Sequence, residues 1–434
     1  MISTLKCIEC NKTYNIKEIR YTCDCGSLLE VSNDLEYLKK LYSSSQWKEL
    51  FQNRWKTHEY PFLSGVWRYK ELILPDMPLR SIVSKPEGNT NLYRNRKLSK
   101  FFNIENLYFK HEGENPTLSF KDRGMTAGVS WANYLNVKAV ACASTGDTSA
   151  AMAGYTAELE NMKGIVFLPK DKISYEQLAQ PIAYGCLTLA LETDFDGCMK
   201  LVQEVCTKNN IYLLNSMNSF RIEGQKAIGM ETLQQLDWKV PDWFVIPVGN
   251  AGNISALGKG LQELYALGII DKLPKIAGIQ VHGSEPFYLS YKQEFKEKIT
   301  VTAQPTSASA IRIGNPVSYE KAKRVIDKFN GVVESVTEEE LLNVKAVVDA
   351  AGISICPNSA TAVAGMQKLY EKGIIKSTDT VVVILTAHGL KFSHTIIEYH
   401  QNKIPYVTSK YTNMPVNLPA DYYKIKEFLN GIIT

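Results

Sequence analysis

Four of the nine cysteines lie close together near the start of the chain, and their spacing is that of a metal site. Cys7-x-x-Cys10 is followed by Cys23-Asp-Cys25, a pattern typical of a zinc ribbon, in which four thiolates surround one Zn²⁺ as a tetrahedron. The second pair is one residue closer than usual, so a ribbon that has lost its metal is the alternative. Zinc held in this way would be structural, because four protein thiolates leave no coordination position open for chemistry.

Lys121 is a candidate nucleophile. It follows an expected strand and stands beside Phe120, Asp122 and Arg123, at the start of an expected helix. Partial burial and a nearby cation would lower the pKa of its ammonium group, and the neutral amine could then form a Schiff base with a carbonyl. The spacing alone leaves an ordinary solvated lysine open.

A glycine-containing turn, Gly249-Asn250-Ala251-Gly252-Asn253, lies between the apolar segment 243–248 and a helix expected to begin at Ile254. Its glycines let the backbone approach a ligand, and the free N–H groups of a helix start attract an anion, best a phosphate. A plain strand-to-helix turn is the alternative. The turn is not the G-x-G-x-x-G fingerprint, which argues against a dinucleotide.

A polar loop at 143–149 also connects an expected strand to an expected helix. Its hydroxyl groups, its glycine and the free amides of the helix start can hold a carboxylate. Plain N-capping is the alternative, because Ser, Thr and Asp are the preferred caps. The loop has more hydroxyl groups than a cap requires, so we favour ligand binding.

Short apolar runs alternate with amphipathic stretches along most of the chain. The strands expected are 106–112, 138–144, 163–169, 243–248, 276–283 and 380–385. Several are apolar at consecutive positions, which is typical of strands covered by helices on both faces. Helical patterns such as 255–268 and 338–352 end at glycines. The alternation predicts a parallel, doubly wound α/β architecture, preceded by a helix-rich segment with helices near 35–42 and 47–55.

The chain has 434 residues, which predicts two or three domains at roughly 150 residues each. Its 49 basic and 45 acidic side chains give a net charge of +4, with no basic excess to indicate nucleic acid binding. No apolar run reaches roughly 18 residues, so no membrane span is expected. The first residues lack the pattern of a secretory signal, so we expect a cytoplasmic protein whose cysteines are thiols or metal ligands.

Several long segments occur in the order found in one enzyme family. ENPTLSFKDRGM, CASTGDTSAAMAGY and PVGNAGNISALGKG resemble three signatures of the threonine synthases, which are pyridoxal-phosphate enzymes of fold type II. The segments LNSMNSFRIEGQKA, DFDGCMKLVQEV, SAIRIGNPVSYEKA and LTAHGLKF are also similar to that family. The resemblance extends from about residue 20 to the end of the chain.

The resemblance implies a role for each matching residue. Lys121 would carry pyridoxal 5′-phosphate as a Schiff base and shuttle protons. The residues that would hold the cofactor phosphate are Gly249, Asn250, Ala251, Gly252 and Asn253. Thr386 would contact the pyridine nitrogen, and Asp147, where many relatives have asparagine, would lie beside the ring hydroxyl. The residues that would bind substrate are Ser144, Thr145 and Thr148 for its carboxylate, and Asn215, Ser216 and Arg221 for its phosphate.

The implied reaction converts O-phospho-L-homoserine and water to L-threonine and phosphate, by γ-elimination and β-addition. Because the reaction needs a closed, dry pocket, a smaller mobile domain is expected to close on a larger one. The expected division is a zinc-ribbon-like module at 1–33, a helical lead-in at 34–84, a large domain at 85–125 and 227–434, and a smaller mobile domain at 126–226. We expect a monomer or a homodimer whose partner is a small phosphorylated amino acid.

The sequence departs from the family pattern near the expected cofactor site. Leu118 replaces a small, glycine-like position, which would narrow the space there. The segment Cys356-Pro357-Asn358-Ser359-Ala360-Thr361 departs from the usual Pro-x-Thr-Gly-Val pattern, which lines the same region. These changes keep a sister enzyme open, for example cysteate synthase, which uses O-phosphoserine and sulfite. A non-catalytic binding protein that uses the zinc ribbon to contact nucleic acid or a partner is the more distant alternative.

Overall fold

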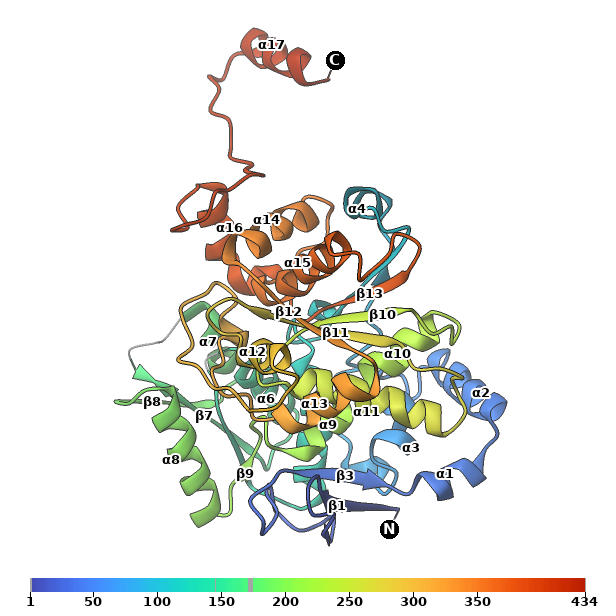
Figure 1. Ribbon diagram of the computed structural model, residues 1–434. Coiled ribbons are helices and arrows are strands. Elements are labelled where there is room, and N and C mark those ends of the chain that lie inside the picture. Colours follow the sequence, from blue (N-terminus) through green and yellow to red (C-terminus); the bar gives the residue numbers. More distant parts are fainter. Residues whose placement is uncertain (1, 145, 171–174, 434) are drawn as a thin grey trace.

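Two parallel sheets, each covered by helices, form the body of the protein. The computed structural model describes residues 2–144, 146–170 and 175–433 (Figure 1). The larger sheet has the order β12-β11-β10-β13-β5-β4, and the edge strand β4 is its antiparallel member. Its strands are β4 (Leu92–Tyr93), β5 (Asn106–His111), β10 (Trp243–Pro247), β11 (Lys275–Val281), β12 (Val332–Val336) and β13 (Thr380–Leu385). The predicted doubly wound α/β architecture is confirmed.

The smaller sheet contains four parallel strands in the order β8-β7-β6-β9. They are β6 (Ala139–Ala143), β7 (Lys163–Pro169), β8 (Leu187–Leu191) and β9 (Tyr212–Leu213). All six expected strands are present in the two sheets. Strands β8, β9 and β12 were not expected, because β9 has two residues, β8 lies at an edge, and polar Glu334 and Ser335 interrupt the apolar pattern of β12.

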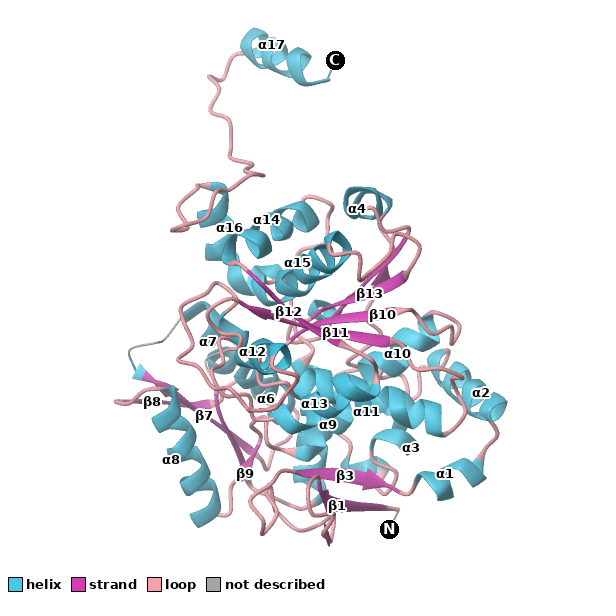
Figure 2. Ribbon diagram, viewed as in Figure 1, coloured by secondary structure: helices cyan, strands magenta, loops and turns pink. Residues whose placement is uncertain are grey.

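Helices cover both faces of the larger sheet (Figure 2). One face carries α4 (Arg96–Phe102), α14 (Glu338–Asp349), α15 (Pro357–Glu371) and α16 (Ser393–His400), and the other carries α10 (Ala227–Gln235), α11 (Gly252–Ala266) and α13 (Tyr319–Lys328). Successive strand residues point to opposite faces. Trp243 and Val245 therefore belong to the hydrophobic core on the side of α14 and α15. Phe244 and Ile246 belong to the core on the side of α10 and α11.

Further helices complete the body. The part of the body that contains the smaller sheet also contains α5 (Lys121–Tyr134), α6 (Asp147–Thr156), α7 (Tyr175–Ala183), α8 (Phe195–Lys208) and α9 (Ser219–Gln225). The remaining helices are α1 (Leu35–Leu41), α2 (Ser44–Trp55), α3 (Lys70–Ile73) and α12 (Pro286–Lys292). The expected helices correspond to α1, α2, α5, α6, α11 and α14. Helix α11 begins three residues before the expected 255–268 segment, inside the glycine turn.

A small antiparallel sheet at the start of the chain packs directly on the body. Its order is β2-β1-β3, with β1 (Ser3–Cys7), β2 (Thr13–Tyr14) and β3 (Leu29–Asn33). The carbonyl oxygen of Leu29 accepts hydrogen bonds from Ser219 Oγ at 2.8 Å and from Lys321 Nζ at 2.7 Å. The Leu213 amide donates to the Tyr21 hydroxyl at 2.7 Å. The module is therefore joined both to the smaller sheet and to the helices beside the larger one.

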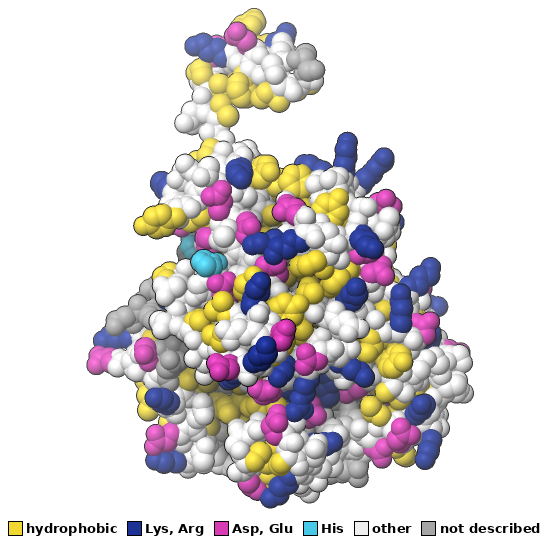
Figure 3. Space-filling model, viewed as in Figure 1, with side chains coloured by type: hydrophobic (Ala, Val, Ile, Leu, Met, Phe, Trp, Pro, Cys, Tyr) yellow, Lys and Arg dark blue, Asp and Glu magenta, His cyan; other side chains and the backbone are white. Residues whose placement is uncertain are grey.

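The last helix, α17 (Tyr422–Ile433), stands away from the body at the end of an extended segment (Figure 1). None of its residues is buried, and its apolar side chains face solvent (Figure 3). No helix within the described ranges is long and apolar enough to cross a membrane.

Candidate active site

The loop before Lys121 is hydrogen-bonded along its backbone to the loop after β13. The Phe120 amide donates to Thr386 O at 2.9 Å, and the His388 amide donates to Leu118 O at 3.1 Å. Ser119 and Ala387 form an antiparallel bridge between these two bonds. The pairing brings Lys121 and Thr386 together from distant parts of the sequence.

Lys121 is the first residue of α5, and its side chain is half-buried. Its Nζ lies 4.1 Å from the centroid of the Phe120 ring. Burial and the positive charge of Arg221 lower the pKa of the Lys121 ammonium to about 7, and the negative charge of Asp147 acts in the opposite direction. A large fraction of the amine is therefore neutral, and nucleophilic, at neutral pH.

A balanced set of buried charges fixes the start of α5. Arg123 donates from Nε to Glu112 Oε2 at 2.6 Å and from Nη2 to Glu231 Oε1 at 2.8 Å. Lys110 Nζ also donates to Glu231, and all four side chains are fully buried. Buried charges are tolerated only when they are paired and hydrogen-bonded. The two cations and two carboxylates therefore hold the helix that begins at Lys121.

Thr386 lies at the end of β13, beside the start of α15. Its Oγ1 is 3.3 Å from Ser359 Oγ and 4.0 Å from Cys356 Sγ. Ser359 Oγ also accepts from the Thr386 amide at 2.8 Å. The segment 356–361 was expected in this region, but no role was expected for Ser359, because only the turn into α15 brings its hydroxyl to Thr386.

The glycine turn fits an anion. Among the described residues no side chain caps α11, and Ala251 precedes the helix in the left-handed region at φ 61°. Both polar atoms of the buried Asn253 side chain lack a hydrogen-bond partner in the described structure. A Cβ on Gly249 would lie 2.9 Å from Ile311 Cα, so this position requires glycine. Unsatisfied donors at a helix start suit a phosphate group.

The polar loop after β6 presents Asp147, the first residue of α6. Its buried carboxylate forms an ion pair with Lys391, with Oδ1 2.9 Å from Nζ. Gly146 occupies the N-cap position, and within the described ranges no side chain caps α6, so the capping alternative is not what the loop does. Thr148 is half-buried, the Gly146 amide donates to Ser144 Oγ at 3.3 Å, and Thr145 lies outside the described residues.

Arg221 supplies a buried cation close to Lys121. Burial lowers the pKa of its guanidinium to about 10. Its Nη1 donates to Leu214 O at 3.0 Å, and its Nε lacks a partner in the described part of the chain. The guanidinium of Arg221 can therefore donate a further hydrogen bond to an anion. Ser216, five residues earlier in the chain, is half-buried. The Asn215 amide group is occupied differently, because it exchanges hydrogen bonds with the N–H and carbonyl of Ala143 at 3.0 and 2.9 Å.

Leu118 and Asn358, the two departures from the family pattern, both affect the backbone: Leu118 through its own conformation and Asn358 through a hydrogen bond. Leu118 has φ 66°, in the left-handed region that favours glycine. The left-handed conformation at this position therefore favours glycine, in addition to any limit on the space for a side chain. Asn358 is buried, and its Oδ1 accepts from the Ala310 amide at 3.1 Å.

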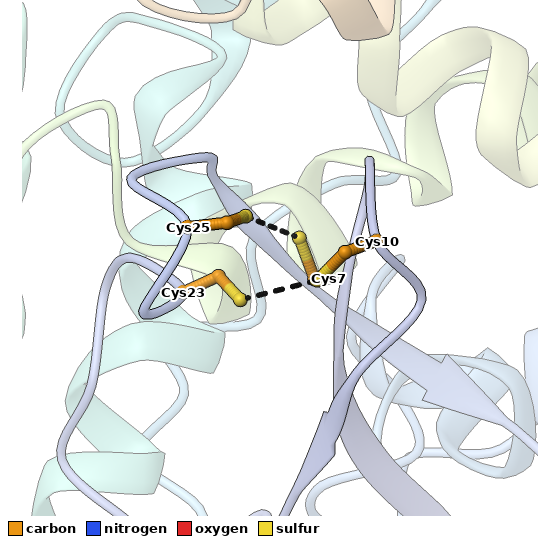
Figure 4. A group of neighbouring side chains, drawn as sticks. All are labelled: Cys7, Cys10, Cys23 and Cys25. Atoms are coloured by element: carbon orange, nitrogen blue, oxygen red, sulfur yellow. Dashed lines mark hydrogen bonds between the residues drawn. The ribbon is translucent and has the colours of Figure 1, made fainter.

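The four N-terminal cysteines form one cluster (Figure 4). Their Sγ atoms all lie within 4.8 Å of one another, with 3.5 Å between Cys7 and Cys25 and between Cys10 and Cys23. Thiolates at about 2.3 Å from a tetrahedral zinc would be roughly 3.8 Å apart. The cluster therefore has the composition and size of a zinc site.

Taken together, the residues around Lys121 suit a phosphorylated aldehyde. Lys121 offers an amine for a carbonyl group, and the start of α11 offers donors for a phosphate. Thr386 offers a hydroxyl on the loop that pairs with the loop before Lys121. Of the residues expected here, Asp147 and Arg221 are the two whose charges act on Lys121. Lys391 was missed, because its sequence position gives no sign of its buried partner.

Known proteins resemble this chain over most of its length. Residues 83–387 match the model of the pyridoxal-phosphate dependent enzyme family. The chain is 44% identical to threonine synthase 2, chloroplastic, of Arabidopsis thaliana, over 96% of this chain and 82% of that protein. It is 46% identical to threonine synthase of Methanocaldococcus jannaschii, over 89% and 92%. The structure of threonine synthase from Escherichia coli matches the fold with a TM-score of 0.66 at 16% identity, covering 99% and 100% of the two chains.

We expect the amine of Lys121 to react with an amine-directed acylating reagent with a midpoint near pH 7, because its pKa is about 7 and only the neutral amine reacts. An ordinary lysine has a pKa of about 10.4. Peptide mass spectrometry on cofactor-free protein measures the rate at each pH, with the lysines of α17 as internal references. Arg221→Ala removes a neighbouring cation and should move the midpoint upward. A midpoint near 10 for Lys121 would contradict the assigned environment.

Proposed function

The chain belongs to the pyridoxal-phosphate dependent enzyme family and, within it, to the threonine synthases, and we propose on that basis that Lys121 carries the cofactor. The observation that supports this assignment best is its half-buried amine, with a pKa of about 7, at the start of α5. The predicted fold type II architecture is confirmed. The cofactor is pyridoxal 5′-phosphate, which when bound supplies an electron sink for carbanions of the substrate.

The reaction is that of a threonine synthase. O-phospho-L-homoserine loses phosphate from its γ-carbon, and water adds at the β-carbon, which gives L-threonine. We assign the proton transfers at the α- and β-carbons to Lys121. An amine with a pKa of about 7 can both accept and return a proton at neutral pH.

Other residues of the site would hold the cofactor in place. We assign its phosphate to the turn Gly249–Asn253, since the unpartnered Asn253 amide and the uncapped start of α11 offer donors there. Thr386 would face the pyridine nitrogen, supported by Ser359. A neutral hydroxyl at the nitrogen moderates the electron sink. Asp147 would lie beside the ring hydroxyl.

The substrate would lie between the polar loop and Arg221. We assign its carboxylate to Ser144, Thr145 and Thr148, and its phosphate to Ser216 and Arg221. Arg221 suits a phosphate because a planar guanidinium donates several hydrogen bonds at once. Asn215, included in this group from the sequence, would contribute by holding the start of the polar loop at Ala143.

We further propose that residues 126–226 form a smaller domain that closes on the large domain at 85–125 and 227–434, excluding water from the reaction. The N-terminal parts would be the zinc-ribbon-like module at 1–33 and the lead-in at 34–84. The protein would act in the cytoplasm, as a monomer or a homodimer.

The purified protein should carry a yellow cofactor band, and Lys121→Ala should abolish it because the covalent attachment is lost. With O-phospho-L-homoserine the wild-type protein should release threonine and phosphate in equal amounts. The same assay with O-phosphoserine, with and without sulfite, distinguishes a cysteate synthase. Product formed from O-phosphoserine and sulfite, but not from O-phospho-L-homoserine, would replace the threonine synthase assignment.

Arg221→Ala should lower kcat/KM for O-phospho-L-homoserine by a factor of tens to thousands, since losing a buried charged partner typically costs about 2–5 kcal/mol. Arg221→Lys should recover part of the loss, because lysine offers a point charge without the planar fork. The cofactor band should persist in both variants. Arg96→Ala, which changes an exposed arginine of α4, is the matched control. Near-normal kcat/KM in Arg221→Ala would rule out this phosphate site.

We also propose that Cys7, Cys10, Cys23 and Cys25 bind one structural zinc. The convergence of their four Sγ atoms supports this assignment. Because β1 and β3 share the core of the body, loss of the metal would loosen packing on α9 as well as the module itself.

Replacing the two exposed cysteines, as Cys10→Ser and Cys25→Ser together, should reduce bound zinc from one per chain to near zero. The melting temperature should fall by roughly 5 °C, because ligation contributes folding free energy. Elemental analysis and thermal melting are the measurements, and Cys186→Ser, outside the cluster, is the control. Wild-type protein produced with zinc available but containing no metal would disprove the site.

A further inference from the structure

The ammonium group of Lys391 has three hydrogen-bond partners from three separate segments. Nζ lies 2.9 Å from Asp147 Oδ1, and it donates to Thr117 O at 3.0 Å and to Gln180 Oε1 at 2.9 Å. An ammonium group has three donors, so its capacity is fully used. The side chains of Lys391 and Asp147 are only 7% and 8% exposed. The ion pair is therefore buried and does not lie on the surface.

The pair lies where the two halves of the protein meet at the candidate active site. Lys391 belongs to the short helix Gly389–Phe392, five residues after Thr386 on the loop that pairs with the lysine loop. Asp147 begins α6, and Gln180 belongs to α7, both beside the smaller sheet. Lys391 therefore connects both of these helices to Thr117, four residues before Lys121.

The charge of Asp147 acts on Lys121. The Asp147 carboxylate is close enough to raise the pKa of Lys121, against the effects of burial and Arg221. A buried carboxylate without a cation would act on Lys121, and on any group bound there, with its full charge. Lys391 compensates that charge at 2.9 Å.

We propose that Lys391 is a positioning residue that orients Asp147 and cancels its charge, so that the pair meets the cofactor ring as one neutral hydrogen-bonding unit. This inference rests on the proposed function, in which Lys121 carries the cofactor and Asp147 lies beside the ring hydroxyl. Asp147 together with Lys391 has a net charge of zero.

Other charged and titratable groups lie near the pair, and none of them is substituted in the experiment below. They are Lys121 and Asp122 at the start of α5, Arg221 on α9 and Cys356 at the start of α15.

The test measures two pH midpoints in Lys391→Gln, Asp147→Asn and the double variant. One is the spectral midpoint of the Lys121–cofactor linkage in the loaded protein, and the other is the acylation midpoint of Lys121 in the cofactor-free protein. Lys391→Gln leaves a bare carboxylate, which favours the protonated amine or linkage, so both midpoints should rise. Asp147→Asn leaves a bare ammonium, so both should fall. We expect each shift to be on the order of one pKa unit. The double variant should return close to wild type.

Lys372→Gln is the matched control, because Lys372 also pairs with a buried carboxylate, Glu334, about 20 Å along α15 from Ser359. It should lose stability without moving either midpoint. Equal shifts of one sign in the two single variants, or no shift, would overturn the inference and leave the proposed function intact. If Lys391→Gln fails to retain the cofactor, the acylation midpoint and the double variant decide. A wild-type protein without a cofactor band would instead overturn the proposed function.

Discussion

The backbone pairing between residues 118–120 and 386–388 is the interaction on which the rest of the site depends. It joins the segment that begins α5 to the loop that leaves β13, so one set of hydrogen bonds positions Lys121, Thr386 and Lys391. Leu118 adopts a left-handed conformation to make it, although a residue with a Cβ does so at a cost of roughly 1–2 kcal/mol. The buried ion pairs of Arg123 then hold the helix from behind.

The buried charges that hold the start of α5 are balanced by opposite charges, whereas Arg221 beside Lys121 has no acidic partner among the described residues. Arg123, Lys110 and their two carboxylates are fully paired, and their role is to fix the backbone. Among the described residues, the hydrogen-bond partner of the Arg221 guanidinium is the carbonyl of Leu214, and its positive charge helps to lower the pKa of Lys121. In the proposed function the same cation would also receive the substrate phosphate, so one residue would serve both nucleophile and substrate.

The sequence predicted the elements whose signals are local. Strands such as β10 and β13 are continuous apolar runs, and the glycine turn before α11 needs no tertiary information to be recognised. The edge strand β8 and the polar-centred β12 carried no such signal, because their pairing is decided by neighbours far along the chain. For the same reason the partners of Lys391 and Asn215 were not predictable. Each is fixed by a segment distant in sequence.

The hydrogen bonds of Tyr21 and Leu29 to the body limit how much of the N-terminal segment can be removed from this enzyme. Leu213 and Ser219, which donate these bonds, flank the segment that carries Ser216 and precede Arg221. Deleting the first 33 residues would strip the acceptor from a buried Leu213 amide and uncover the apolar face of α9. The zinc-ribbon-like module at 1–33 therefore supports the segment that carries Ser216 and Arg221, and a shortened enzyme would have to keep it.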